Sequence, residues 1–357
     1  MEWFKTIKNT LKSGKTIPPG TYSTTCYTQS DRPYKLLLTV EQDGHGRLVV
    51  NAHTILFLNQ SSTEYVYHFM QSQYGDDVVA FMQARYRIGR AEVLADYEAL
   101  IGQIEGLLDQ QDLSPLTMLQ GVSNESDGGL VPVKLDLYPM IGESFEGNMP
   151  LAQWQALLKH ARDAGVAHFV LVGGDPLAWS GVLPLVSTSE ELGVVMGIVA
   201  NQSKLRMAQL EQLIGAGLDH LAILVGKDQQ ADWPLLQQVS KRNLYFQVVF
   251  EVADDNVAST INALAEAGNY GVRNVAFEAM SEMQQANLDA LFDAVDGNGL
   301  QFVPFAEMVC RDGTGKDLQR FAQPGNTARN ATIVMPNGQV RSLARGMWRD
   351  VKDFLAR

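Results

Sequence analysis

The chain has little of what several common kinds of functional site require. It contains only two cysteines, Cys26 and Cys310, among its 357 residues. Neither a disulfide framework nor a Cys-x-x-Cys metal site can be built from them. The six histidines are scattered, without an HxxxH or HExxH pair. No apolar run reaches the roughly 20 residues that a membrane-spanning helix needs. These absences exclude most metal sites and integral membrane proteins.

Positive charge is scarce as well. The formal net charge is −12, which argues against binding to nucleic-acid phosphates. The first 16 residues, "MEWFKTIKNTLKSGKT", are the exception, with four lysines and an apolar helical face. Two interpretations stay open for residues 1–16: contact with a membrane surface, or a terminal helix docked on the protein itself or on a partner. The N-terminus has no signal-peptide pattern, so we expect a cytoplasmic protein.

Apolar residues, by contrast, are plentiful. The chain is 46% hydrophobic and 19% charged, which allows a sizeable core, and its length suits two domains. A polar stretch containing Gly, Ser and two prolines, "QQDLSPLTMLQGVSNESDGGLVP", is typical of a linker. The expected organisation is an N-terminal segment (1–20), a small domain (21–110), a linker (111–132), a large domain (133–304) and a C-terminal extension (305–357).

The small domain begins with a hairpin pattern. "KLLLTVEQDGHGRLVV" has two apolar runs around Asp43-Gly44-His45-Gly46, where glycines supply positive φ. Three helical patterns follow: one from Ser61, then "DDVVAFMQARY" and "RAEVLADYEALIGQIEGLLDQ". This order predicts a winged-helix-like α+β domain. The last helix is acidic, so DNA phosphates would be repelled there.

The stretch "GRLVVNAHTILFLNQSSTEYVYHFM" and the long helix after it resemble the RiPP recognition element. This is the peptide-binding winged helix of the small chaperone in the pyrroloquinoline quinone pathway. The resemblance covers about Tyr34 to Leu108. It implies that a peptide adds as an extra strand to the edge of the hairpin Lys35–Val50, with the helix Arg90–Leu108 as the other wall of the groove. The alternative is a domain that serves only as a cap or for dimerisation.

From Val133 onward, strand and helix patterns alternate. Repeated βα units imply a parallel sheet with outer helices, here an open or partial TIM barrel. The expected strands are "VKLDLY", "HFVLVGG", "GVVMGIVAN", "HLAILVG", "LYFQVVFEV", "RNVAFEA" and "QFVPF".

The stretch "VLVGGDPLAWSGVLPLV" resembles the second strand and loop of radical SAM enzymes, whose consensus is "GGEPLL". The resemblance implies that Gly173 and Gly174 let the backbone approach the methionine end of S-adenosylmethionine. Asp175 stands where an acidic residue pairs with the cofactor's ammonium group. Asn201, at the end of "GIVAN", stands where that family has a "TNG"-type ending. These four residues form the predicted remnant of a cofactor pocket.

The chain departs from this family where the cluster ligands should be. Radical SAM enzymes hold a [4Fe–4S] cluster on a CxxxCxxC loop after the first strand, but here the loop "LDLYPMIGESFEGNMP" contains no cysteine. The C-terminal "RFAQPGNTARNATIVMPNGQVRSLARG" resembles a SPASM-type extension, with its cysteine positions near Pro324 and at Leu343. Because these cysteines are missing, we expect no iron–sulfur cluster and no catalytic residue of that chemistry. We also expect weak or absent binding of S-adenosylmethionine.

Several polar residues should still lie near the strand ends of the large domain. They are Asp136, Tyr138, Asp175, Asn201, Lys227, Glu251 and Glu278. Such a group could hold a divalent cation through oxygen ligands or supply a general base. The competing interpretation is that these residues cap helices and form ion pairs. We expect structural roles for His160, His168, Trp154 and Trp179.

The leading hypothesis is a non-catalytic, radical-SAM-like protein that binds a peptide, a partner enzyme such as an intact radical SAM enzyme, or both. The first alternative is an enzyme that uses the remnant pocket without a cluster, through non-radical S-adenosylmethionine or carboxylate–metal chemistry. The second is a structural subunit of a larger assembly. A family fold does not by itself decide between them.

Overall fold

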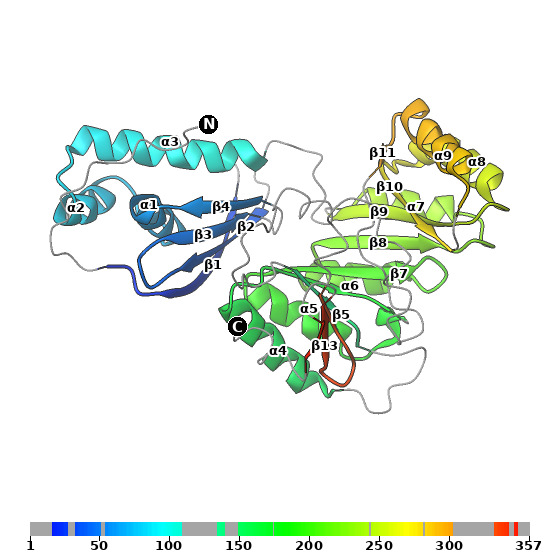
Figure 1. Cartoon of the computed structure of the whole chain (residues 1–357), viewed down its shortest axis with the longest axis horizontal. Helices are drawn as coiled ribbons and strands as arrows, with labels where there is room; N and C mark the ends of the chain where they lie inside the picture. The colour runs from blue at the N-terminus through cyan, green and yellow to red at the C-terminus, as the bar shows by residue number, and fades with distance from the viewer. Residues whose placement is uncertain are drawn as a thin grey trace. The chain divides into compact units, whose positions relative to one another are not determined.

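The computed structural model forms two compact units, Met1–Leu113 and Ser114–Arg357, each described here by itself (Figure 1). The division falls inside the expected linker 111–132. The predictions for residues 1–15, the linker, Cys310 and the positions at Pro324 and Leu343 concern residues outside the described ones. The structure describes residues 16–27, 33–50, 54–108, 134–139, 149–173, 175–242, 244–280, 283–302, 332–342 and 346–348.

The first unit contains a four-stranded antiparallel sheet in chain order. Its strands are β1 (Gly20–Tyr27), β2 (Pro33–Val40), β3 (Gly46–Val50) and β4 (Thr54–Leu58). The predicted hairpin is confirmed as β2 and β3, with Gly44 at φ 84° in its turn. However, β1 pairs along β2 and β4 pairs along β3. Neither edge of the hairpin is open, so the expected strand addition to the hairpin itself is wrong.

The three predicted helices follow the sheet. They are α1 (Gln60–Met70), α2 (Asp76–Arg85) and α3 (Arg90–Leu108). Asn59 caps α1, its side-chain oxygen accepting from the Ser62 amide at 2.9 Å. Alternate strand residues and the helices form one hydrophobic cluster, which includes Leu36, Leu48, Tyr65, Met82 and Ile104. The unit is an α+β domain; its assignment as a winged helix stays a prediction.

The second unit is an α/β domain built on a parallel sheet. Strands β5 to β11 lie next to one another in chain order and pair in parallel, which is consistent with the predicted partial barrel. The strands are β5 (Lys134–Leu137), β6 (His168–Leu171), β7 (Val195–Asn201), β8 (His220–Val225), β9 (Tyr245–Val252), β10 (Asn274–Ala279) and β11 (Gln301–Phe302).

Helices connect these strands and cover one face of the sheet. They are α4 (Leu151–Asp163), α5 (Val182–Glu191), α6 (Met207–Gly215), α7 (Trp233–Ser240), α8 (Val257–Ala267) and α9 (Gln285–Gly297), with single 3₁₀ turns η2 (Pro176–Ala178) and η3 (Gly268–Tyr270). Residues such as Leu135, Phe169 and Ile198 point into this helical layer. Because side chains alternate along a strand, their neighbours Asp136, Val170 and Val199 lie on the other, inner face of the sheet.

The predicted C-terminal hairpin is present as β12 (Thr332–Val334) and β13 (Val340–Ser342), followed by β14 (Gly346–Trp348). Gly338, at φ 83°, completes the turn. The sequence did not indicate where the hairpin docks. Strand β12 pairs in parallel with β5, so the hairpin extends the main sheet. Among the described residues, no helix combines the length and hydropathy of a membrane span.

Candidate functional site

The glycine turn after β6 lies close to a side chain of the same unit, whereas the sequence predicts that it approaches a cofactor. Gly173 has φ 76°. A Cβ atom at this position would lie 1.8 Å from Cε2 of Tyr138. Tyr138 directly follows β5 and is only 1% exposed. The Tyr138 ring therefore occupies the space beside the Cα atom of Gly173.

The inner face of the sheet around this ring is packed with apolar side chains. Tyr138 forms a hydrophobic cluster with Val170, Val172, Val199 and Ala222, among others. Met335, from the turn of the C-terminal hairpin, belongs to the same cluster and is buried. Protein interiors of this kind are close-packed. These residues do not fit the methionyl end of S-adenosylmethionine at Gly173.

Asp175 retains one feature of a binding residue. It is half-buried, and its Oδ1 atom is buried without a hydrogen-bond partner among the described residues. An unpaired carboxylate oxygen is an acceptor for an ammonium group. The backbone oxygen of Asp175 accepts from the Ala178 amide at 3.0 Å, which starts η2. Its neighbour Gly174 lies outside the described residues.

Asn201 supports the loop after β7. Its Oδ1 atom accepts from the Ser203 amide at 2.9 Å and from the Ser203 hydroxyl at 2.7 Å. Its backbone oxygen accepts from the Lys204 amide at 3.0 Å. This is an Asx turn. The structure thus assigns the side chain to the backbone of its own loop.

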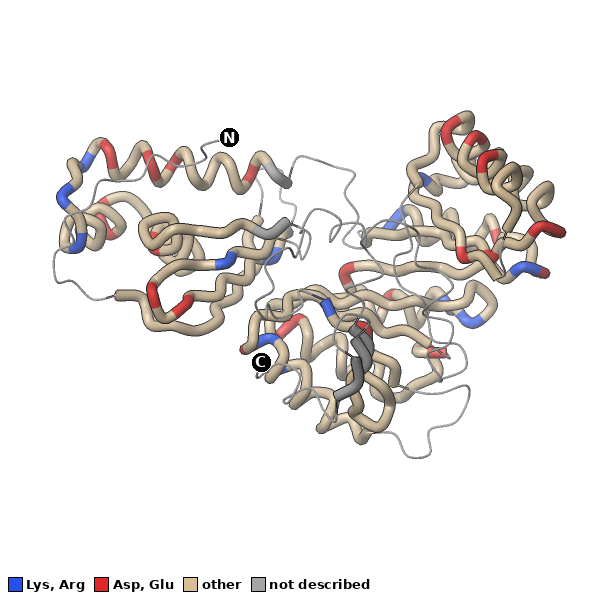
Figure 2. Tube along the Cα trace, viewed as in Figure 1, with Lys and Arg blue, Asp and Glu red and all other residues tan. Residues whose placement is uncertain are grey.

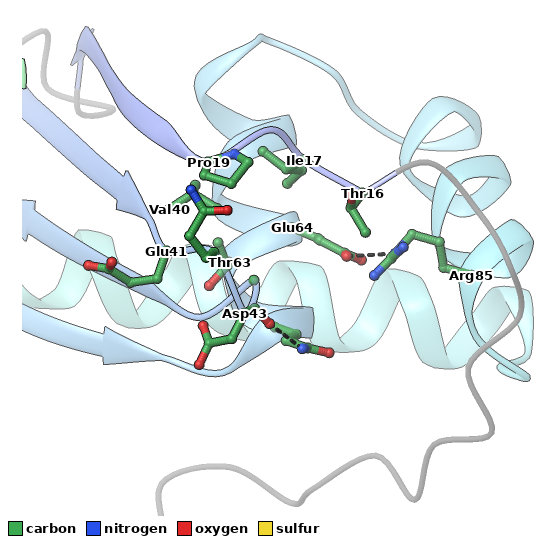
Figure 3. A pocket seen from close by; sticks show the side chains of 12 residues that line it. Thr16, Ile17, Pro19, Val40, Glu41, Asp43, Thr63, Glu64 and Arg85 are labelled. Carbon is green, nitrogen blue, oxygen red and sulfur yellow. Dashed lines mark hydrogen bonds and ion pairs between the residues drawn. The ribbon is translucent and has the colours of Figure 1, made fainter.

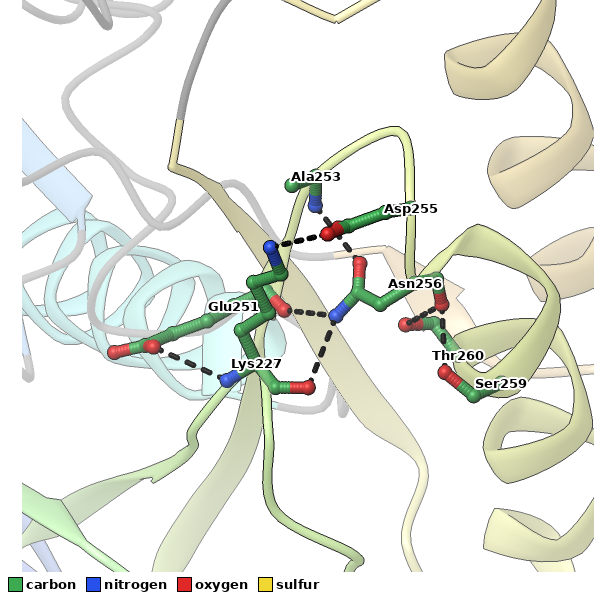
Figure 4. A network of polar contacts seen from close by, with 7 residues as sticks. All are labelled: Lys227, Glu251, Ala253, Asp255, Asn256, Ser259 and Thr260. Atoms are coloured by element: carbon green, nitrogen blue, oxygen red, sulfur yellow. Dashed lines mark hydrogen bonds and ion pairs between the residues drawn. The ribbon is translucent and has the colours of Figure 1, made fainter.

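Lys227 and Glu251 belong to a network that joins the ends of β8 and β9 (Figure 4). The Lys227 ammonium lies 2.6 Å from Asp255, and this hydrogen bond raises the pKa of Lys227. The Lys227 amide donates to Glu251 Oε2 at 3.2 Å. Asn256 Nδ2 donates to the carbonyl oxygens of Glu251 at 2.9 Å and Lys227 at 3.3 Å. Both predicted site residues therefore stabilise loops.

Asp136 forms a buried ion pair with Lys134, at 3.1 Å between Oδ1 and Nζ. Both are on β5 and almost fully buried. Burial raises the pKa of Asp136 and lowers the pKa of Lys134, and each partner's charge opposes these shifts. The sequence analysis identified Asp136 but missed Lys134.

Two buried histidines lie on the same inner face. The Nε2 atoms of His168 and His220 are 2.6 Å apart. Burial, and secondly the charge of Lys134, lowers the pKa of His220 to about 3, so this imidazole is neutral. The His220 ring lies over Gly197, where a Cβ atom would approach it to 1.7 Å. His168 was expected to be structural; His220 was missed.

The position of this polar group favours a structural role. Lys134, His168 and His220 are the first residues of β5, β6 and β8. Ligand sites of parallel barrels lie at the opposite, carboxyl ends of the strands. A polar residue at the start of an apolar run, as in "HFVL" and "HLAILV", and two polar residues within one buried strand, as in "KLDL", are the sequence signals that would have revealed the group.

The remaining predicted residues are dispersed. Glu278 is buried on β10 and His160 is exposed on α4. Trp154 and Trp179 pack edge to face, 6.3 Å between ring centroids, in the helical layer. In the described part of the chain, no three His, Cys, Asp or Glu side chains are placed to hold a metal ion. The cysteine that is described, Cys26, lies on β1 in the first unit.

Comparison with known sequences gives local matches. No protein-family model matches the chain. The PqqA peptide cyclase of Methylobacterium nodulans is 29% identical over 85 residues, 24% of this chain and 22% of that protein. The PqqA peptide cyclase of Gluconobacter oxydans is 31% identical over 85 residues, 24% of each chain. The chain thus spans about a quarter of the length of these curated relatives.

Comparison with solved structures covers more of the molecule. The crystal structure of SuiB from Streptococcus suis aligns with a TM-score of 0.52, covering 85% of this chain and 81% of SuiB at 14% identity. SuiB bound to precursor peptide SuiA aligns with a TM-score of 0.51, covering 89% and 82% at 13% identity. SuiB has also been solved with S-adenosylmethionine. At these identities the likeness shows the fold alone, an α/β fold consistent with the predicted partial barrel.

Proposed function

We propose that this chain is a non-catalytic, radical-SAM-like protein that binds a precursor peptide in a peptide-modification system. The observation that carries the proposal is the Tyr138 ring in the Gly173 turn. Two cysteines in the whole chain, against the three thiolates of a radical SAM cluster, agree with it. Because this chain lacks that redox centre, the chemistry would come from a partner, for which an intact radical SAM enzyme is the candidate. A cytoplasmic location stays a prediction.

A precursor peptide is the ligand that the relatives favour. The sequence matches are to cyclases of the peptide PqqA, and SuiB has been solved with the precursor peptide SuiA. The first unit offers a sheet edge for such a ligand. In the described sheet, β4 pairs only with β3. Unpaired N–H and C=O groups on an edge strand can pair with an extended peptide.

Strand β4 lacks the features that usually block strand addition. Its sequence, "TILFL", has no charge and no proline. Phe57 on this strand is 64% exposed, a large apolar surface for a peptide side chain. Leu56 and Leu58 of β4 pack in one hydrophobic cluster with α3, so Phe57 between them lies on the opposite face of the sheet. We propose that α3 forms the other wall of the groove on the cluster face and that Phe57 contacts the peptide on the outer face. Acidic residues lie along α3 (Figure 2). Glu92 and Glu98 on this helix are exposed. A peptide with positive charge should therefore bind best, and its affinity should fall as the salt concentration rises.

Replacing Phe57 tests this site. We expect Phe57→Asp to weaken peptide binding by about thirtyfold, because loss of an aromatic anchor costs roughly 2 kcal/mol. A displayed random-peptide library would be selected on the full chain, and the affinity of one selected peptide measured by fluorescence anisotropy. Tyr27→Asp is the matched control, since Tyr27 is 62% exposed on β1, the other outer strand.

The control should bind the peptide as the unchanged protein does. Hydrogen exchange adds a second measure: peptide should slow exchange of β4 amides. If Tyr27→Asp abolishes binding and Phe57→Asp does not, the β4 edge is not the peptide site. If neither variant changes the affinity, capture by the sheet edge is contradicted, and a structural role becomes the better account.

A further inference from the structure

Helix α3 turns small side chains away from the core of the first unit. Its large apolar residues are buried: Val93, Tyr97, Leu100 and Ile104. Its small residues lie on the opposite side and are exposed: Ala91, Ala95, Ala99, Gly102 and Gly106. Because they recur every three or four positions, these five residues form one stripe along the helix. Among the described residues, nothing lies within 4 Å of a Cβ atom placed on Gly102 or Gly106.

The two glycines of this stripe weaken the helix that contains them. Glycine within a helix is less favourable than alanine, and neither Gly102 nor Gly106 packs against the core of the unit. What glycine offers in exchange is the close approach of another backbone. The stripe therefore suits a second helix that packs closely on α3.

Carboxylates flank the stripe on both sides. Glu92 and Asp96 lie on one flank, Glu98 and Glu105 on the other. The arginine of this helix, Arg90, is engaged by an aspartate of α2. In the part of the chain that the structure describes, none of the four carboxylates forms an ion pair. Burial, and secondly the charge of Glu92, raises the pKa of Asp96. This face therefore attracts a basic partner and repels a second copy of itself.

The sequence of residues 1–15 has the complementary pattern. In a helix, its large apolar side chains would form one stripe: Trp3, Phe4, Ile7 and Leu11. Its four lysines would lie along one side of that stripe: Lys5, Lys8, Lys12 and Lys15. The segment carries one acidic residue, Glu2. It matches α3 in side-chain size, large against small, and in the sign of its charge.

The described chain begins close to α3. Thr16 and Arg85 line the same small pocket (Figure 3), and Ile17 is buried in the core of the unit. Arg85 ends α2, five residues before α3 begins at Arg90. A helix of 15 residues is about 22 Å long, and the 19 residues of α3 span about 28 Å. Residues 1–15 can therefore reach along most of the stripe, antiparallel to α3.

We infer that residues 1–15 dock as a helix on the small-residue stripe of α3, with their lysines against its carboxylates. Of the two interpretations that the sequence left open for this segment, this is docking on the protein itself. An isolated helix of this length is marginal in water, so the contact with α3 is what stabilises it. The docking does not depend on the proposed peptide binding. Where both occur, a cationic peptide competes with these lysines for the charge of α3.

Hydrogen exchange of the full chain, read by mass spectrometry, tests the docking. We expect the amides of residues 3–15 to exchange about tenfold or more slowly than in a synthetic peptide of residues 1–15. About 1 M salt should reduce this protection. Asp96→Lys/Glu98→Lys reverses one charge on each flank and should bring exchange to within about twofold of the free peptide. Glu191→Lys/Glu266→Lys, at exposed ends of α5 and α8, changes the net charge equally and should leave the protection intact.

Gly102→Leu tests the stripe separately and covers the case that the charge-reversal variant does not fold. Leucine is a better helix former than glycine, so α3 should form, while the larger side chain should release residues 1–15. Exchange at the free-peptide rate in the unchanged protein, or protection that survives in whichever α3 variant folds, would overturn the inference. Protection that appears only with anionic lipid vesicles, or only as the protein concentration rises, would overturn it in favour of a membrane surface or a second copy.

Discussion

Gly173→Ala is expected to destabilise the second unit by about 2–5 kcal/mol. Two costs combine in this variant. The φ of 76° costs a residue with a Cβ atom roughly 1–2 kcal/mol, and forcing the Tyr138 ring away from its 1.8 Å approach adds an overpacking cost of about 1–3 kcal/mol. Urea unfolding of the full chain, followed by fluorescence, measures the loss.

Two further variants separate these costs. Gly299 has φ 64° and nothing within 4 Å of a Cβ atom, so Gly299→Ala should show only the backbone cost. Tyr138→Ala removes the ring, and in that background Gly173→Ala should also cost only about 1–2 kcal/mol. If the costs of Gly173→Ala and Tyr138→Ala simply add, the ring does not occupy the turn, and the main argument against a cofactor there is lost.

Lys134→Met is expected to cost about 3–5 kcal/mol of unfolding free energy, because it leaves Asp136 buried without its cation. The double variant Lys134→Met/Asp136→Leu should recover most of this loss, since two apolar side chains replace two desolvated charges. Urea unfolding of the single and double variants gives the comparison.

A half-exposed ion pair provides the control. Arg242 pairs with Glu211 at 2.5 Å, with side-chain exposures of 35% and 47%. Arg242→Met should therefore cost no more than about 1 kcal/mol. If Lys134→Met/Asp136→Leu is as unstable as Lys134→Met, the two charges do more than neutralise each other. A functional role for Lys134, Asp136 and His220 would then have to be reconsidered.

The parallel sheet could be predicted because its strands are nearly continuous apolar runs separated by helices with a clear apolar face. The antiparallel sheet was predicted only in part. Strand β1, "GTYSTTCY", is rich in Ser and Thr and shows no apolar alternation. Strand β4 is five residues long and runs almost directly into α1. The sequence did not indicate that β1 pairs with β2 and β4 with β3, so the hairpin β2–β3 was expected to have an open edge.

The candidate site shows a different limit. The sequence located the Gly173 turn correctly, but what fills it depends on the pairing of β5 with β6, which matches Leu137 with Leu171 and so puts Tyr138 beside the turn. The docking of β12 on β5, which brings Met335 into the same cluster, is likewise a long-range contact. Local patterns carry no information on either. Asn201 and Lys227 were placed correctly at strand ends, while their hydrogen bonds became visible only in the structure.

We propose that this α/β scaffold holds no radical SAM centre. The most direct measurement is the iron bound per chain after anaerobic reconstitution with iron and sulfide and desalting. The cysteine count predicts no more iron in the unchanged protein than in the Cys26→Ser/Cys310→Ser variant. About four irons per chain, as in a [4Fe–4S] cluster, present in the unchanged protein and lost in that variant, would contradict the account.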